Sequence, residues 1–215
     1  MRETTLLRCV AGLSPPTGGQ VVLGGRPVVE PPPEMVLVFQ DYTRSLCPWR
    51  KVLGNVLLAL EHGVLTRAQQ RRRAMDALRL VALEGFENHY PWQLSGGMQQ
   101  RLQIARALAY RARIMLMDEP FGSLDALTRA ELEDQLLAIW GAATGSILFV
   151  THDIEEAVYL SDRVYVLSRR PSRVIEQIEI KLERPRNQLT TREDPRFIQT
   201  RHRIFELIST ELARS

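Results

Sequence analysis

The stretch from Leu94 to Asp125 constrains the fold of this chain more than any other part of the sequence. It reads LSGGMQQRLQIARALAYRARIMLMDEPFGSLD. Three small residues, Ser95, Gly96 and Gly97, stand directly before a segment with apolar residues at helical spacing. Next come a short apolar run of the buried-strand type, at 114–117, and then the acids Asp118 and Glu119. This order predicts an α/β fold with its site at the carboxyl ends of the strands.

The same stretch predicts phosphate chemistry. A helix N-terminus opened by small residues presents unpaired N–H groups and the positive end of the helix dipole, and both attract phosphate. Two adjacent carboxylates at the end of a central strand are costly to bury unless they are used. Metal-assisted phosphoryl transfer uses them, with Asp118 holding Mg²⁺ directly or through water and Glu119 polarising the attacking water. Taken singly, an SGG before a helix is often only a turn, and a DE pair after a strand is often a solvated loop.

These motifs resemble those of the ATP-binding-cassette ATPases. LSGGMQQR is similar to the signature motif of that family, and IMLMDEP is similar to its Walker B motif with the catalytic glutamate. Ser123-Leu124-Asp125 stands where the family has its D-loop. The resemblance covers nearly the whole chain and implies a P-loop NTPase fold, an α/β core with an inserted helical subdomain.

Two further loops carry the resemblance. The string VFQDYTRSLCPW, with Gln40 after an apolar strand at 35–39, resembles the Q-loop, whose glutamine contacts Mg²⁺ and the attacking water. The string THDIEEA, with His152 after a strand at 146–150, resembles the H-loop, whose histidine contacts the γ-phosphate. The resemblance therefore implies that Gln40, Glu119 and His152 are catalytic and that Gln40 and Asp118 serve Mg²⁺.

The start of the printed chain departs from the family pattern. Thr4-Thr5-Leu6-Leu7 resembles the end of the P-loop G-x-x-x-x-G-K-[ST] and the helix after it, which implies that Thr4 and Thr5 bind nucleotide and that Thr4 also serves Mg²⁺. Arg2 and Glu3 stand where the glycine and the lysine of that motif belong, and its glycine-rich arc and the preceding strands are absent from the sequence. A carboxylate in place of an ammonium about 4 Å from a phosphate turns an attraction of roughly 4 kcal/mol into a repulsion. We therefore expect the 215-residue chain to bind ATP weakly. Either the start codon is assigned inside the motif and the natural protein is longer, or the site has degenerated.

Length and composition limit the classes of protein to which this chain can belong. The 215 residues suit one domain, and 45% apolar with 25% charged residues is typical of a globular protein. No apolar run reaches the roughly 18 residues of a membrane span, and no signal peptide is evident. Cys9 and Cys47 have no metal-site spacing and are expected to be free thiols. The net charge of +3 does not indicate nucleic acid, and Arg71-Arg72-Arg73 is expected to be a solvated helix face.

The resemblance implies one cassette domain divided into an α/β core (1–45 and 103–180), a helical subdomain with the signature motif (46–102) and a C-terminal helical extension (181–215). Trp49, Tyr90 and Trp92 either dock onto a permease or pack the core of the helical subdomain. The other predicted strands are at 20–23, 163–168 and 173–180. Helices are predicted at 55–61, at 66–81, where a capping box opens the helix, and at 126–140. A linker at 185–191 is predicted to precede a final amphipathic helix capped by Asp194-Pro195.

The resemblance also implies partners. In the family two cassettes sandwich ATP head to tail, so Ser95, Gly96, Gly97 and Asp125 would complete the site of a second cassette, which we expect to be an identical chain. The motif-bearing strings look most like those of bacterial importers for nitrate, sulfonates or taurine. These pair the cassette with a transmembrane permease and, indirectly, a periplasmic or extracellular substrate-binding protein, which implies a peripheral location on the cytoplasmic face of the membrane and no nucleic-acid partner.

The sequence leaves one further class of function open and argues against another. The first is an inactive cassette that retains dimer and permease contacts while its partner hydrolyses ATP, an alternative favoured by Glu3. The second, an ATPase of the chromosome or repair type, requires a long coiled-coil insertion, and the sequence contains none.

Overall fold

The computed structural model describes residues 3–41, 45–61, 63–122, 124–141 and 145–213. Its helices are α1 (Glu3–Val10), α2 (Val52–Leu58), α3 (Arg67–Leu80), the 3-10 helix η1 (Pro91–Gln93), α4 (Gly96–Tyr110), α5 (Ala126–Gly141), α6 (Ile154–Leu160), α7 (Thr190–Glu193) and α8 (Pro195–Ala213). Its strands are β1 (Val22–Leu23), β2 (Arg26–Pro27), β3 (Met35–Val38), β4 (Ile114–Asp118), β5 (Ser146–Val150), β6 (Arg163–Leu167) and β7 (Val174–Glu179).

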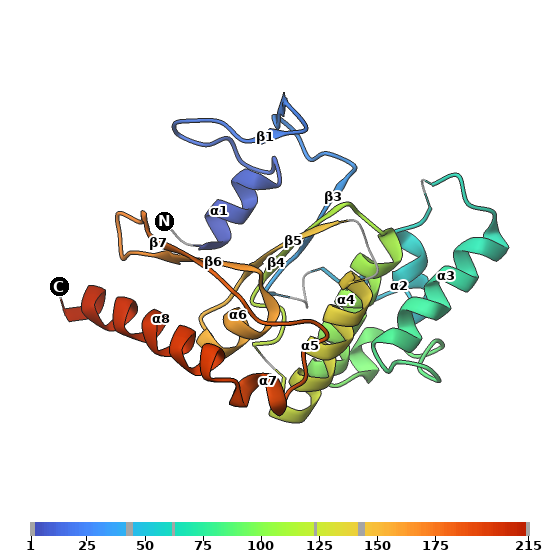
Figure 1. Cartoon of the computed structure of the whole chain (residues 1–215). Helices are drawn as coiled ribbons and strands as arrows, with labels where there is room; N and C mark the ends of the chain where they lie inside the picture. The colour runs from blue at the N-terminus through green and yellow to red at the C-terminus, as the bar shows by residue number, and fades with distance from the viewer. Residues whose placement is uncertain (1–2, 42–44, 62, 123, 142–144, 214–215) are drawn as a thin grey trace.

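A three-stranded parallel sheet forms the centre of the molecule (Figure 1). Strand β4 lies between β3 and β5 and pairs with both in parallel. The register places Val38 opposite Met117, and Asp118 opposite Val150. Because the strands run in one direction, their carboxyl ends lie at the same edge, and the loops that follow them meet there.

Helices cover both faces of this sheet, which explains why its strands are continuously apolar. Successive side chains of a strand point to opposite faces, so each strand supplies both layers. Helix α1 lies on one face (Figure 1). Leu7 of this helix and Ala11, directly after it, are buried there. The sheet residues of that layer are Met35, Leu37, Ile114, Leu116, Leu148 and Val150. The alternate residues, Val36, Val38, Met115, Met117, Ile147 and Phe149, belong to the larger cluster on the other face.

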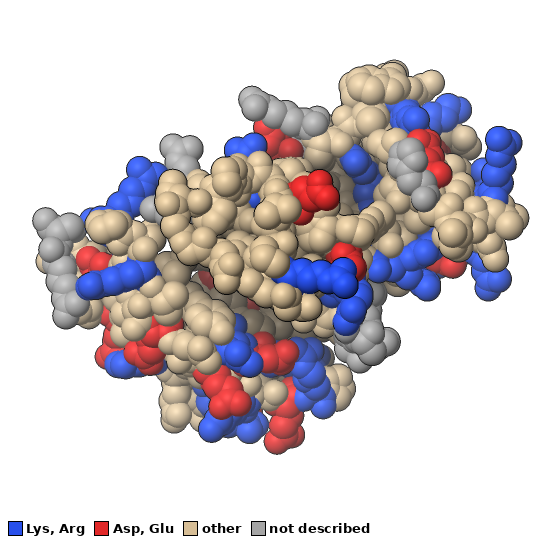
Figure 2. Space-filling model, turned by 90° about the horizontal axis from the view of Figure 1, so that it is seen from above, with Lys and Arg blue, Asp and Glu red and all other residues tan. Residues whose placement is uncertain are grey.

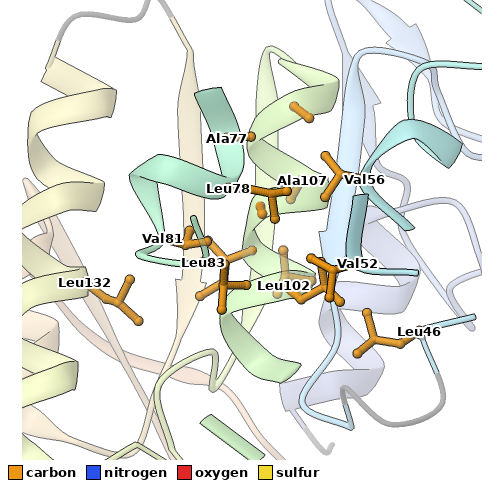
Figure 3. Close-up of a cluster of buried hydrophobic side chains, with 14 of the residues drawn as sticks. Leu46, Val52, Val56, Ala77, Leu78, Val81, Leu83, Leu102, Ala107 and Leu132 are labelled. Atoms are coloured by element: carbon orange, nitrogen blue, oxygen red, sulfur yellow. The ribbon is translucent and has the colours of Figure 1, made fainter. Parts of the chain in front are cut away.

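That larger cluster joins the sheet to helices α2, α3, α4 and α5. Figure 3 shows Val52 and Val56 from α2, Leu78 from α3 and Leu102 from α4 lying close together. The N-terminus of α3 is fixed by Thr66, whose side chain accepts a hydrogen bond from the Gln69 N–H while Gln69 Oε1 accepts one from the Thr66 N–H. This confirms the predicted capping box.

The C-terminal part packs separately against α6. Strands β6 and β7 form an antiparallel pair, as predicted, and α8 buries Phe197 and Ile204 against Val158 and Tyr159 of α6. The Arg196 N–H donates a 2.8 Å hydrogen bond to Asp194 Oδ1, so Asp194 caps α8 as predicted.

Several predicted boundaries are wrong by a few residues. The strand expected at 20–23 has only two residues, and it pairs with β2, which the pattern did not predict. The helix expected at 55–61 is α2 and begins at Val52, because Asn55 turns inward and bonds to the carbonyls of Cys47 and Arg50.

The segment predicted as a linker, 185–191, is instead packed against the body of the protein. Arg186 is 9% exposed and donates to the Tyr159 carbonyl, and Gln188 donates to the Ala130 carbonyl. Proline and polar residues suggested a solvated connection, but these two side chains point inward and donate to backbone carbonyls of α5 and α6.

The surface carries charges of both signs. Figure 2 shows acidic and basic side chains intermixed on the face seen there, with Lys and Arg frequent around the part that carries α3. Cys9 and Cys47 are both free, as expected. Across the ranges that the structure describes, no helix is long and apolar enough to cross a membrane.

Candidate active site

Side chains from three loops converge on one oxygen atom at the carboxyl edge of the sheet. Gln40 follows β3, Glu119 follows β4, and His152 follows β5. Gln40 Nε2 donates a 2.9 Å hydrogen bond to Glu119 Oε2, and His152 Nδ1 lies 3.1 Å from the same oxygen. The structure therefore brings together the three residues predicted to be catalytic.

The backbone of Glu119 is held in an uncommon conformation. Its φ angle is +46°, in the left-handed region that residues with a side chain rarely adopt. Its N–H donates to the Val150 carbonyl over 2.9 Å, and its carbonyl accepts from the Gly122 N–H. These bonds turn the chain sharply out of β4 and aim the carboxylate across the end of β5. Strain of this kind clusters at functional sites.

Asp118 is the last residue of β4 and is 3% exposed. The turn that follows it is tied to the signature helix, because Gln100 of α4 donates to the Pro120 carbonyl. Asp118 thus lies at the same edge as Glu119 while its side chain is far less exposed to solvent.

The predicted signature residues form the N-terminus of α4. Ser95 is the N-cap and its hydroxyl accepts from the Met98 N–H over 3.3 Å, while Gly96 is the first helical residue. A Cβ on Gly97 would lie 3.1 Å from the Leu124 side chain, which makes a small residue favourable there. Within this chain no hydrogen bond between described residues joins Ser95, Gly96 or Gly97 to the Gln40–Glu119–His152 group.

Asp125 directly precedes α5 and acts as its cap. Its Oδ1 accepts a 3.0 Å hydrogen bond from the Thr128 N–H, and the hydrogen bonds from Thr128 lower the pKa of the Asp125 carboxyl. Ser123, in the string that resembles the D-loop, lies outside the described residues.

A second cap fixes the loop that carries His152. Asp153 Oδ1 accepts from the N–H groups of Glu155 and Glu156 at the start of α6, and its Oδ2 lies 3.1 Å from Arg129 Nη1. Arg129, in the first turn of α5, also donates to the Leu124 carbonyl. One guanidinium thus joins the segment before Asp125 to the segment after His152. Sequence reasoning missed this link, although Asp153 lies in the string that resembles the H-loop.

Glu156 is a buried acid behind this loop. It is 4% exposed, and burial raises the pKa of its carboxyl to about 7. It lines a small cavity of about 40 Å³ together with Glu119, Gly122, Arg129, Thr151, His152 and Asp153. A polar cavity of this size has room for a water molecule.

The donor set at this edge suits a nucleotide-bound magnesium ion. Mg²⁺ prefers oxygen ligands and usually keeps waters and substrate phosphates among them. At this edge Asp118 offers a carboxylate and Gln40 an amide oxygen, while Thr4 and Thr5, which were predicted to join them, lie in the first turn of α1. No cluster of three or more His, Cys, Asp or Glu side chains that could hold a metal by itself occurs among the residues placed in the structure.

Sequence comparison connects this site to known proteins. The ABC transporter family profile matches residues 3–122. An ABC transporter ATP-binding protein of Methanocaldococcus jannaschii is 48% identical over 213 residues, which are 99% of this chain and 78% of that protein. The nitrate import ATP-binding protein NrtD of Synechococcus elongatus is 42% identical over 98% of this chain and 77% of its own. The taurine import ATP-binding protein TauB of Pseudomonas putida is 41% identical over 97% and 80%.

Comparison of structures agrees with these matches. An ATP-binding cassette solved as a dimer in a post-hydrolysis state, bound to ADP and Pi, superposes with a TM-score of 0.72 at 30% identity. The superposition covers 83% of this chain and 81% of that one. The predicted fold class is therefore confirmed: the chain belongs to the ABC transporter family, as an ATP-binding cassette with the P-loop NTPase fold.

Proposed function

We propose that this cassette is the ATP-hydrolysing subunit of an importer for a small anion of the nitrate, sulfonate or taurine type. The observation that carries the proposal is the convergence of Gln40 and His152 on Glu119 Oε2, at 2.9 Å and 3.1 Å. An acceptor oxygen held by an amide and an imidazole is suited to orient a water molecule and take up its proton.

Each residue of the site has a role that suits its side-chain chemistry. Bound MgATP supplies the transferable phosphoryl group and the metal charge that neutralises it. Asp118, Gln40 and Thr4 hold Mg²⁺, and Thr5 binds nucleotide. Glu119 polarises the attacking water, the Gln40 amide fixes the carboxylate that does so, and His152 contacts the γ-phosphate.

A second copy of the chain completes the site. Ser95, Gly96 and Gly97 open α4 with N–H groups suited to phosphate, and they serve the partner's nucleotide together with Asp125. This head-to-tail arrangement is supported by their lack of a described hydrogen bond to the catalytic group of their own chain, and by the dimeric state of the related cassette.

The helical subdomain, proposed as residues 46–102, docks onto the permease. Trp49 is 75% exposed and Trp92 is 67% exposed, so neither packs the core, which removes that interpretation for both. Tyr90 stacks on Trp92 with ring centroids 5.3 Å apart. Exposed aromatic side chains of this kind are enriched at protein interfaces. The α/β core at 1–45 and 103–180 and the extension at 181–215 complete the proposed division.

The choice of anion comes from the relatives, since the cassette itself has no contact with the cargo. The names of two relatives specify nitrate and taurine import. We place the complex at the cytoplasmic face of the membrane, with a substrate-binding protein on the other side.

A second candidate is a cassette that binds its partners without hydrolysing ATP. It is favoured by one observation, the acidic residue Glu3 at the position where the family pattern has the P-loop lysine. In that case a partner cassette supplies the hydrolysis, and the Gln40–Glu119–His152 group is a remnant.

Two proteins distinguish the candidates. The first is the 215-residue chain. The second, called here the completed cassette, carries the strand and P-loop of the nitrate-import relative ahead of Thr4. The importer proposal predicts that Mg²⁺-dependent ATP binding and hydrolysis are strong only in the completed cassette. If the completed cassette binds ATP but does not hydrolyse it, alone or with its permease, the non-hydrolytic candidate is correct.

A further inference from the structure

We propose that residues 186–192, named here the C-terminal strap, are a positioning device that fastens α5 to α6 and so sets the placement of His152 against Glu119. The inference rests on the proposed function only for the role of His152. The fastening itself follows from contacts within the chain.

The two fastened helices each begin at a functional loop. Helix α5 starts directly after Asp125, and α6 starts two residues after His152. A shift of α6 relative to α5 therefore changes the position of His152 relative to Asp125. The same shift moves Asp153, which bonds to Arg129 of α5 and caps α6.

Arg192 is the strap residue that contacts both helices. Its Nη2 donates to Glu133 Oε2 of α5 over 3.0 Å, and its Nη1 donates to Glu155 Oε2 of α6 over 2.8 Å. Its guanidinium carbon lies 5.1 Å from the centre of the Tyr159 ring on α6. The planar fork of an arginine suits such divided contacts, which a lysine cannot reproduce.

Gln188 holds Arg192 in this position. Gln188 Oε1 accepts a 2.9 Å hydrogen bond from Arg192 Nε. Gln188 Nε2 has three acceptors on α5 within 3.1 Å: the Ala130 carbonyl, Glu133 Oε2 and Asp134 Oδ1. The side chain therefore bridges the strap to α5 with its whole amide.

Arg186 attaches the other end of the strap to the end of α6. Its side chain is 1% exposed, and its Nη1 donates to the Tyr159 and Ser161 carbonyls over 2.7 Å and 2.9 Å. A cation suits this place, because the last carbonyls of a helix are unpaired and carry the negative end of the dipole.

The strap also pairs with a buried acid. Glu133 is 0% exposed, and burial raises the pKa of its carboxyl above the ordinary value, although the hydrogen bonds and charge of Gln188 and Arg192 oppose that rise. Removing one partner of a buried ion pair leaves the other without compensation, which is strongly destabilising. The strap is therefore held more firmly than a surface ion pair would hold it.

The test compares amide hydrogen exchange in the nucleotide-free 215-residue chain and its R192Q variant. The amides to follow are those of Glu155 and Glu156, which bond to Asp153 next to His152. We expect R192Q to raise their exchange rates by at least about tenfold while β4 changes by less than about twofold. The matched control is R203Q, which breaks the Arg203–Glu176 ion pair between α8 and β7 and leaves α5 and α6 untouched. It should change the two amides by less than about twofold.

A second variant and a second readout complete the test. Q188A is also expected to raise the exchange rates of these two amides, and it replaces R192Q in the test if R192Q does not fold. Equal exchange in R192Q and R203Q, or a uniform increase that includes β4, would overturn the fastening. In the completed cassette R192Q should lower kcat and leave KM for ATP unchanged, and an unchanged kcat would overturn the positioning role. If the completed cassette without the substitution does not hydrolyse ATP, the proposed function fails while the exchange result still decides the fastening.

Discussion

Gln40 Nε2 donates a 2.9 Å hydrogen bond to Glu119 Oε2, and the two residues come from loops separated by 79 positions in the chain. The bond exists because β3 and β4 are parallel neighbours whose carboxyl ends lie at one edge. It orients the carboxylate before any ligand is bound.

Replacing this amide tests its orienting role. In the completed cassette we expect Gln40→Ala to lower kcat by about 10- to 100-fold, because Glu119 loses a donor that fixes it. KM for ATP should change by less than about threefold, since most nucleotide contacts remain. Steady-state kinetics measure both quantities. A large rise in KM with unchanged kcat would mean that Gln40 binds nucleotide and does not orient the carboxylate.

The head-to-tail dimer predicts complementation between two defective chains. Completed cassettes with Ser95→Arg or with Glu119→Gln should each be nearly inactive alone. When they are mixed, each heterodimer contains one intact site, made by Glu119 of the first chain and Ser95 of the second. ATPase activity should therefore reappear on mixing, at no more than about half of that of the unmutated dimer. Full activity of the Ser95→Arg chain alone would contradict the arrangement.

Gly12 is expected to be essential for the turn after α1. Its φ angle is +70°, and a Cβ there would lie 2.5 Å from the Glu30 carbonyl oxygen. Gly12→Ala combines a backbone conformation unfavourable to alanine with a collision against backbone, so the free energy of unfolding should fall by about 2 kcal/mol or more. Urea unfolding measures this. Gly18→Ala is the control, because no atom lies within 4 Å of the added Cβ, and a similar loss in both variants would contradict the explanation.

Glu156 predicts a pH dependence of stability. Burial raises the pKa of its carboxyl to about 7, from an ordinary value of 4.5. The folded state therefore binds this proton more tightly than the unfolded state, and the resulting stability is present below pH 4.5 and is lost as the pH rises through 7. Glu156→Gln removes this titration, so between pH 4.5 and 8 the variant should gain about 3 kcal/mol relative to the unmutated chain.

Urea unfolding at several pH values checks the Glu156 prediction. Glu183→Gln serves as its control, because that side chain is 89% exposed. If the stability of the Glu156→Gln variant follows the same pH curve as that of the unmutated chain, the buried carboxyl is not the group that titrates.

The sheet was predictable because its signals are local, whereas the proposed catalytic roles of three loop residues came from the resemblance of their loops to those of the family. An apolar run followed by a polar residue marks each of β3, β4 and β5, and parallel pairing then brings Gln40, Glu119 and His152 to one edge. The order of the strands did not have to be known for this, since every carboxyl end is at the same edge.

The strap and the buried acid could not be predicted, because their partners are distant in sequence. Gln188 bonds to Glu133, 55 positions away, and Arg192 bonds to the same carboxylate 59 positions away. Read locally, these polar residues and the nearby prolines indicate a solvated linker. Glu156, three residues after the cap Asp153, has the spacing of an exposed capping-box residue, and only packing against α5 makes it buried.

In the proposed function Glu119 is the catalytic carboxylate of an ATP-hydrolysing cassette. The most direct test is the ATPase rate of the completed cassette with and without Glu119→Gln, measured together with ATP-dependent dimerisation. We predict that the substitution lowers the rate by at least about 100-fold and leaves an ATP-bound dimer, because Gln keeps the shape of the side chain but cannot take up a proton. Hydrolysis at the unmutated rate by the Glu119→Gln protein would contradict the claim.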